Sequence, residues 1–234
     1  MKRFYKTVSV SDSKDGWQVL LDGRAIRRQG GAAQNVPSHA LAEALAQEWR
    51  DQGETLDLAR FPMRDMTDFA LDVAAADRPA LAAKTLAFAE TDTLCYRADP
   101  GDALLAEQEK VWDPLLTAFE DAEGVRFARV SGIMHHAQPD ETIATLHRRL
   151  LALGQFELTA LHTAASLAAS LCIGIAAMKP GSDIDALWSA AHLEEEWQAR
   201  LWGRDEEAEQ RNAERREAFR RAALFAKLIA TQSS

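Results

Sequence analysis

Hydrophobic and polar residues alternate along the chain between Arg3 and Gln29, as they do in strands with one buried face. The alternating apolar positions are Phe4, Val8, Val10, Trp17, Val19 and Leu21. Asp15-Gly16 precedes the second alternating run and Asp22-Gly23 follows it. Asp-Gly pairs readily adopt the positive φ angles of tight hairpin turns. The pattern therefore predicts antiparallel sheet built from two successive hairpins.

The period of the apolar positions changes after Pro37. Ser38 is a suitable N-cap for a helix in which Leu41, Leu45 and Trp49 recur every four residues. We expect this helix to cover one face of the sheet. These segments together predict a β-rich N-terminal domain over residues 1–64 with one covering helix.

The pattern is helical almost throughout the remaining chain, so we predict a larger all-α domain over residues 65–234 and an α+β fold class. Met66, Phe69 and Val73 form one apolar stripe. The segment from residue 158 to residue 178 is apolar on nearly all sides and predicts a helix at the centre of a bundle. Polar residues interrupt this segment, so we do not expect it to insert into a membrane.

The last fifty residues predict strongly charged helix in two pieces around Gly203. Ala190, Leu193, Trp197 and Leu201 are spaced to form an apolar stripe on this helix. The side chains that surround the stripe and follow it are Glu194, Glu195, Glu196 and Trp202. An acidic and aromatic patch of this kind suits a partner held by an apolar anchor and by arginine pairing. The alternative interpretation is a core-facing stripe with solvated edges.

Composition narrows the range of partners. The chain has 234 residues, with 27 basic and 36 acidic side chains and a net charge of −9. An acidic chain disfavours nonspecific binding to nucleic acid or to anionic lipid, since both require a basic surface. The two cysteines, Cys95 and Cys172, lie far apart and suggest neither a disulfide framework nor a thiolate metal site. The first residues lack the pattern of a signal peptide, so we expect a cytoplasmic protein.

Motifs of several enzyme classes are absent from the sequence. It contains neither the glycine-lysine pair of a P-loop nor the G-x-S-x-G turn of a hydrolase. His135-His136 has no H-E-x-x-H around it, and the spacing of His192 with Glu196 fails an inverted zinc motif at a required histidine. We therefore predict no catalytic residue, no metal and no cofactor. The alternative is a metal- or carboxylate-dependent hydrolase that uses His135, His136 or His192.

Several short strings occur in one order along nearly the whole chain. They are Arg3-Phe4-Tyr5-Lys6, Leu21-Asp22-Gly23-Arg24, Glu48-Trp49, Phe61-Pro62-Met63, Thr91-Asp92-Thr93-Leu94-Cys95-Tyr96-Arg97, Trp112-Asp113-Pro114-Leu115, Leu193-Glu194-Glu195-Glu196-Trp197-Gln198 and Trp202-Gly203. This ordered set resembles the ATP synthase mitochondrial assembly factor 2 family, here in a bacterial form without a mitochondrial presequence. The run from Arg27 to Gly31 departs from the lysine-threonine-proline run that the resemblance leads us to expect.

The resemblance implies a chaperone and not an enzyme. Members of the family bind the free α subunit of the F-type ATP synthase head and prevent its aggregation until β subunits replace them, with no small-molecule substrate. The resemblance places a functional acidic residue among Glu194, Glu195 and Glu196, of which we favour the last two. Trp197 and Trp202 are the expected apolar anchors for the client.

Overall fold

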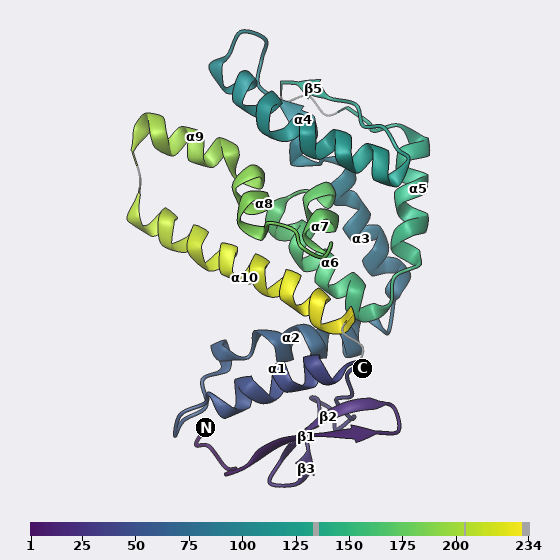
Figure 1. Ribbon diagram of the computed structural model, residues 1–234, viewed down its shortest axis with the longest axis vertical. Helices are drawn as coiled ribbons and strands as arrows, with labels where there is room; N and C mark the ends of the chain where they lie inside the picture. Colours follow the sequence, from purple (N-terminus) through teal and green to yellow (C-terminus); the bar gives the residue numbers. More distant parts are fainter. Residues whose placement is uncertain (133–135, 204, 231–234) are drawn as a thin grey trace.

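The computed structural model describes residues 1–132, 136–203 and 205–230. A small antiparallel sheet lies at one end of the molecule, and helices form most of the rest (Figure 1). This arrangement confirms the predicted α+β class, with a β-rich N-terminal part followed by a larger helical region. Within the helical region, β4 (Tyr96–Arg97) pairs in parallel with β5 (Val130–Ser131).

The N-terminal sheet contains both predicted hairpins. β1 (Val8–Ser13) pairs with β2 (Gly16–Leu21), which pairs with β3 (Arg24–Ala25), so that the strand order is β1-β2-β3. The two-residue turn between β2 and β3 places Asp22 at φ 48° and Gly23 at φ 77°. Positive φ at both positions matches the right-handed twist of the flanking strands.

Helix α1 (His39–Arg50) covers the sheet as expected (Figure 1). The Ser38 hydroxyl accepts a hydrogen bond from the Leu41 N–H at 3.0 Å, which pairs one of the unsatisfied donors at the start of the helix. Leu41 and Leu45 are fully buried in one cluster with Val19 of β2. The four-residue spacing of the apolar positions therefore identified the face of α1 that packs on the sheet.

The remaining elements are helical and follow in chain order. They are η1 (Leu58–Arg60), α2 (Pro62–Phe69), η2 (Ala70–Ala74), α3 (Arg78–Glu90), η3 (Thr93–Cys95), α4 (Ala103–Glu123), α5 (Asp140–Leu151), α6 (Gln155–Ala168), α7 (Leu171–Ala177), α8 (Ile184–Ala191), α9 (Leu193–Trp202) and α10 (Glu206–Ala230). Among the described residues, none of these helices combines the length and the apolar character that a membrane span requires.

The apolar segment over residues 158–178, expected as one helix, forms most of α6 and all of α7 instead. Ala169, at φ 48°, turns the chain between the two helices. Its carbonyl oxygen accepts hydrogen bonds from the N–H and hydroxyl groups of Thr93, at 3.1 and 2.9 Å. The buried carboxylate of Asp92 accepts the Cys172 N–H at 3.0 Å. A segment distant in sequence thus stabilises the break, which the local pattern does not reveal.

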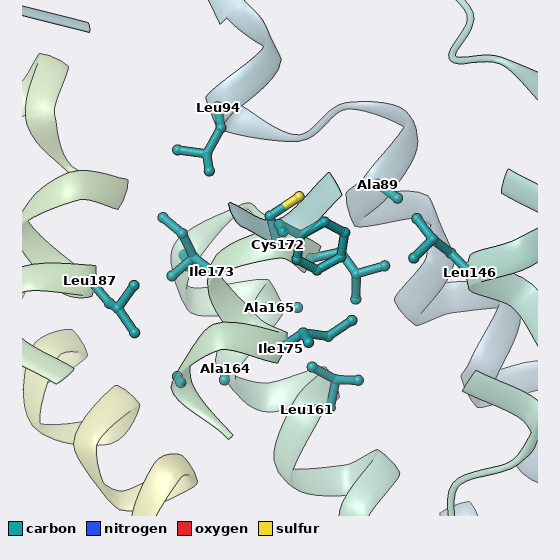
Figure 2. Packing of buried hydrophobic residues seen from close by; sticks show 14 of the residues in the cluster. Ala89, Leu94, Leu146, Leu161, Ala164, Ala165, Cys172, Ile173, Ile175 and Leu187 are labelled. Atoms are coloured by element: carbon teal, nitrogen blue, oxygen red, sulfur yellow. The ribbon is translucent and has the colours of Figure 1, made fainter. Parts of the chain in front are cut away.

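The predicted central position of this apolar segment is confirmed. Figure 2 shows Ile175 of α7 near Leu161 and Ala165 of α6, all of them buried. A Cβ atom at Gly174 would lie 3.0 Å from the Ala165 Cβ and 3.1 Å from its backbone nitrogen. Glycine at this position therefore permits the close approach of the two helices.

The predicted stripe of Met66, Phe69 and Val73 is wrong at its last member. Met66 and Phe69 pack against the core, but Val73 is 51% exposed. The chain passes into the π-helical η2 after Phe69, with a hydrogen bond from the Ala75 N–H to the Ala70 carbonyl oxygen. The wider turn changes the direction of the following side chains, so the simple helical spacing no longer holds.

Helix α10 contributes to both apolar clusters of the protein. Phe219 is buried in the cluster formed by the helical region, whereas Phe225 is buried in the cluster beneath the sheet and α1. The Ser38 hydroxyl also donates to the carbonyl oxygen of Leu228 at 2.6 Å, which joins the start of α1 to the end of α10. The predicted division into residues 1–64 and 65–234 falls within α2 and stays a prediction.

Glu48 on α1 positions the start of α2. Its carboxylate accepts the Met63 N–H at 2.6 Å and the Arg64 N–H at 3.0 Å. Burial nevertheless raises the pKa of Glu48 to about 7, against the lowering effect of these hydrogen bonds and of the Arg64 charge. In the unfolded chain the carboxyl titrates near its ordinary value, so folding takes up a proton between these two pKa values.

Glu48→Gln is therefore expected to change the pH dependence of folding. Rising pH removes the proton from the folded wild-type protein and weakens it, whereas glutamine does not titrate. The unfolding free energy of the wild type minus that of the variant should fall by about 1–2 kcal/mol between about pH 5 and about pH 8, after allowance for solvent screening. Urea titrations of both proteins at several pH values measure this difference. A constant difference would contradict the raised pKa.

Candidate functional site

The predicted acidic and aromatic residues lie on α9. The charged C-terminal segment forms three helices, because the chain bends at His192 between α8 and α9. The break predicted at Gly203 is confirmed, with φ 94° and extended ψ that separate α9 from α10. Helices α9 and α10 both lie at one edge of the molecule (Figure 1).

Buried aromatic residues hold the base of α9. The Trp112 indole N–H donates to the Ala190 carbonyl oxygen at 2.7 Å, which joins α4 to α8. The Trp188 indole N–H donates to Asn212 Oδ1 at 3.2 Å, which joins α8 to α10. The His192 ring stacks on Trp188 with 3.7 Å between centroids. These contacts come from three helices and fix the direction in which α9 leaves the bundle.

His192 has the surroundings of a structural residue. Its Nδ1 lies 3.0 Å from the Trp188 carbonyl oxygen, which requires the ring to donate there. Burial lowers the pKa of the imidazole, while this hydrogen bond and the charge of Glu195 act in the opposite direction. Among residues 1–132, 136–203 and 205–230, no three His, Cys, Asp or Glu side chains are grouped to hold a metal ion. His135 lies outside the described residues, and His136 is exposed.

The three consecutive glutamates of α9 have different surroundings. Glu194 accepts a hydrogen bond from the buried Gln108 side chain at 2.6 Å and so ties α9 to α4. Glu195 faces α10, where it lies 3.5 Å from the Asn212 amide nitrogen and 3.9 Å from the Arg215 guanidinium. Glu196 is half-buried. All three lie in the first turn of α9, where negative charge interacts favourably with the helix dipole.

Glu195 and Glu196 meet in a groove of about 380 Å³ between α9 and α10, hereafter the α9–α10 groove. Asp205 and Glu209 add two further carboxylates from the α10 side. Asp205 and Glu209 are four positions apart, so their common face was detectable from helical spacing, although we did not select them from the sequence. The structure therefore gathers two of the predicted acidic residues and adds two that were missed.

Arginines line the other end of the α9–α10 groove. Arg216 and Arg220 both pair with Asp185, at 3.1 and 2.7 Å. The hydrogen bond from Arg220 lowers the pKa of the Asp185 carboxyl below its usual range. The lining of the α9–α10 groove thus carries four carboxylates against two guanidinium groups, which also share the Asp185 carboxylate. The lining is acidic on balance, which is complementary to a positively charged partner.

The aromatic residues of α9 differ in exposure. Trp197 is half-buried, and the Arg200 guanidinium lies 5.1 Å from its ring centroid. Trp202 and Leu201, at the end of the helix, are 78% and 61% exposed. The predicted apolar stripe is thus wrong at Leu201, whereas its first two members, Ala190 at the end of α8 and Leu193 at the start of α9, are buried in the core. The stripe does not continue because α9 runs along the margin of the bundle (Figure 1).

This molecule resembles known proteins over nearly its whole length. Its structure is similar to the crystal structure of Atp12 from Paracoccus denitrificans, with a TM-score of 0.93 and 33% sequence identity over 97% of this chain and 98% of that one. A crystal structure from Agrobacterium tumefaciens matches with a TM-score of 0.90 and 39% identity, over 96% of this chain and 84% of that one. The mitochondrial protein atp12 of Schizosaccharomyces pombe is 25% identical over 219 residues, which cover 88% of this chain and 75% of the relative. Residues 2–120 match the family described as ATP12 chaperone protein, and the chain belongs to this ATP12 chaperone family.

Proposed function

We propose that this protein is an assembly chaperone of the F-type ATP synthase that binds the free α subunit in the bacterial cytoplasm. It prevents aggregation of that subunit until β subunits displace it. The proposal requires no catalytic step and no cofactor. The observation that carries it, beyond membership of a chaperone family, is the exposed pair Leu201 and Trp202 at the end of α9, the helix whose first turn carries Glu195 and Glu196.

Exposed apolar side chains of this size, next to charge, suit a protein interface. An isolated subunit of an oligomer exposes apolar surface that its neighbours normally cover. Trp202 supplies a large apolar anchor, and aromatic anchors carry much of the binding free energy at interfaces. The carboxylates of Glu195 and Glu196 are placed to pair with arginines of the client. We therefore propose that Glu195, Glu196 and Trp202 contact the client directly.

Glu194 and Trp197 have a different role in this proposal. Glu194 is held by Gln108, and Trp197 is half-buried against Arg200. We propose that Glu194 and Trp197 position the exposed part of α9. Each also contributes to the margin of the surface that binds the client. An interface with few anchors also permits release, because affinity depends on those anchors more than on the area buried.

The purified protein is expected to suppress aggregation of freshly refolded α subunit in the absence of β. Light scattering measures the aggregation, and a sizing column measures the joint peak of the two proteins. Addition of β should remove the joint peak, because β covers the same apolar surface of the α subunit. Freshly refolded β alone is the matched control, and its aggregation should not change. Undiminished scattering of α without a joint peak would overturn the proposed client.

A further inference from the structure

A buried glutamine on α4 contacts the first turn of α9. Gln108 is fully buried, and both ends of its side-chain amide are used. Its Oε1 accepts the Ala98 N–H at 2.8 Å, and its Nε2 donates to Glu194 Oε1 at 2.6 Å. A backbone N–H can only donate, so the amide oxygen must face Ala98 and the amide nitrogen must face Glu194. The orientation of this amide is therefore fixed, and residue 194 must supply an acceptor.

The segment that pairs with the oxygen of Gln108 is itself held against α4. Ala98 directly follows β4, whose Arg97 side chain is buried. The Arg97 guanidinium donates to the Leu94 carbonyl oxygen at 2.9 Å and to Asp113 of α4 at 2.8 Å. These contacts keep Ala98 next to α4, so the oxygen end of the Gln108 amide has a fixed partner.

Trp112 holds the neighbouring corner of the same surface. It lies four positions after Gln108 on α4, so both side chains lie on one face of that helix. Its indole N–H donates to the Ala190 carbonyl oxygen at 2.7 Å, at the end of α8. Gln108 adds a second bond beyond the bend at His192, to α9 itself. The two bonds together fix both α8 and α9 relative to α4.

Few buried contacts fix the rotation of α9 about its own axis. Of its ten residues, all of them described by the structure, Leu193 alone is buried. Glu195 contacts side chains of α10 only at 3.5 and 3.9 Å. The bond from Gln108 to Glu194, at 2.6 Å, is shorter than both. The rotation of α9 therefore depends on Leu193 and on this bond more than on the contacts of Glu195 with α10.

The three consecutive glutamates make that rotation important. Neighbouring residues of an α-helix differ by about 100° in direction. If α9 turned by one residue, Glu195 would approach Gln108 in place of Glu194, and Trp202 would turn by about 100° with it. Burial of Leu193 and the short bond to Glu194 select one of these two rotations. The direction of the exposed Trp202 then follows.

We propose that Gln108 is the positioning residue of the helix that binds the client. It acts through the acceptor oxygen of Glu194 and so sets the direction in which Glu195, Glu196 and Trp202 face the client. Position 194 must supply Gln108 with a hydrogen-bond acceptor, whether or not that acceptor is charged. The use of α9 by the client rests on the proposed function, whereas the contact that holds α9 to Gln108 does not.

Two variants that lose the same charge isolate the hydrogen bond. Glu194→Gln keeps an acceptor oxygen for Gln108, whereas Glu194→Met keeps the length of the side chain without an amide or carboxylate oxygen. Hydrogen exchange of the full chain, followed by mass spectrometry, should show amides 197–203 protected in Glu194→Gln as in the wild type. In Glu194→Met their exchange should be about fivefold faster, because local opening of α9 no longer breaks this bond. Equal exchange in the two variants would overturn the proposal.

Removal of the donor completes a double-mutant cycle. Gln108→Met should speed exchange of amides 197–203 about as much as Glu194→Met does. When Gln108→Met is combined with either variant of Glu194, the two double variants should exchange at the same rate, because no donor remains. An exchange difference of about fivefold that persists without Gln108 would exclude it as the partner through which residue 194 acts.

Gln138 provides a matched control. It is also buried, and its Oε1 accepts the Ala128 N–H at 2.8 Å, but its Nε2 donates back to the carbonyl oxygen of the same residue at 3.2 Å. Gln138→Met should therefore leave the exchange of amides 197–203 as in the wild type. The amides of α6, in the core, should exchange at the wild-type rate in Glu194→Met. Faster exchange of α6 as well would indicate a general loss of stability and contradict a separate effect on α9.

The client assay is interpreted separately from hydrogen exchange, which contains no ATP synthase subunit. Refolded α subunit should bind about fivefold more weakly to Glu194→Met than to Glu194→Gln, and Gln108→Met should abolish that difference. If the wild-type protein does not suppress aggregation of the α subunit, the proposed function fails, while exchange still decides whether Gln108 holds α9. If exchange differs between the two variants but both bind the α subunit equally, the positioning role in client binding is excluded.

Discussion

Charge reversal at two positions of α9, Glu195→Lys with Glu196→Lys, is expected to weaken α subunit binding by about a hundredfold. Each glutamate loses an arginine partner on the client and each lysine adds repulsion, so each position contributes about tenfold. In the aggregation assay, the double variant should give scattering close to that of the α subunit alone. The joint peak on the sizing column should disappear at the same protein concentrations.

The control for this prediction has the same change in net charge elsewhere. Glu54 and Glu90 are exposed and lie outside the α9–α10 groove, so Glu54→Lys with Glu90→Lys should retain full suppression. Because Glu195 lies 3.9 Å from Arg215, circular dichroism melting of the α9 variant must show that it is folded with a melting temperature close to that of the wild type. A folded α9 variant that still suppresses aggregation as the wild type does would exclude these residues from the interface.

Asp92→Ala is expected to lower the unfolding free energy by about 4 kcal/mol. The Asp92 carboxylate is fully buried and accepts the Leu94 N–H and the Cys172 N–H, each at 3.0 Å, and it is also hydrogen-bonded by Ser170. Each donor left unpaired in the core costs about 1–3 kcal/mol. The melting temperature of a chain of this length should fall by about 10 °C, as measured by calorimetry.

Asp102→Ala is the matched control for Asp92. Asp102 also accepts the N–H two residues ahead, from Leu104 at 2.8 Å, but it caps α4 at the exposed surface. Its loss should cost about 1 kcal/mol, as for an ordinary N-cap. If both variants lost the same stability, the buried connection from Asp92 to the start of α7 would contribute little to the fold.

The elements that depend on neighbouring residues agree with the sequence prediction. Ser38 begins α1, Asp22-Gly23 forms the second hairpin, and Gly203 ends α9, because capping and turn geometry involve only a few consecutive residues. The resemblance in the short ordered strings also predicted the family, since those strings extend over both the sheet and the helices.

The exceptions arise where tertiary contacts or a local change of helix type override the simple helical spacing. The break between α6 and α7 depends on Asp92 and Thr93, which lie far from it in the chain. Asp92, for example, precedes its partner Cys172 by 80 positions. Val73 leaves its predicted stripe because the helix widens at η2. Leu201 is exposed because helical spacing predicts a face but not whether another element covers that face.

The candidate site shows the same contrast between what local spacing predicts and what only tertiary packing decides. Helical spacing placed Glu195, Glu196 and Trp202 on one short helix, but only the position of α10 shows which of these side chains share a groove with Asp205 and Glu209. The hydrogen bond from Gln108 to Glu194 is likewise visible only in the tertiary structure, because Gln108 lies 86 positions earlier in the chain.

The sequence by itself determined the fold class, the family, the caps and turns, and the helix that carries the acidic and aromatic residues. These features depend on local backbone preferences and on the order of short motifs. The tertiary structure alone decided the division of the central apolar segment and the partners of Glu194 and Glu195. Burial and hydrogen-bond pairing are properties of segments brought together by folding, so no periodicity within a single segment can reveal them.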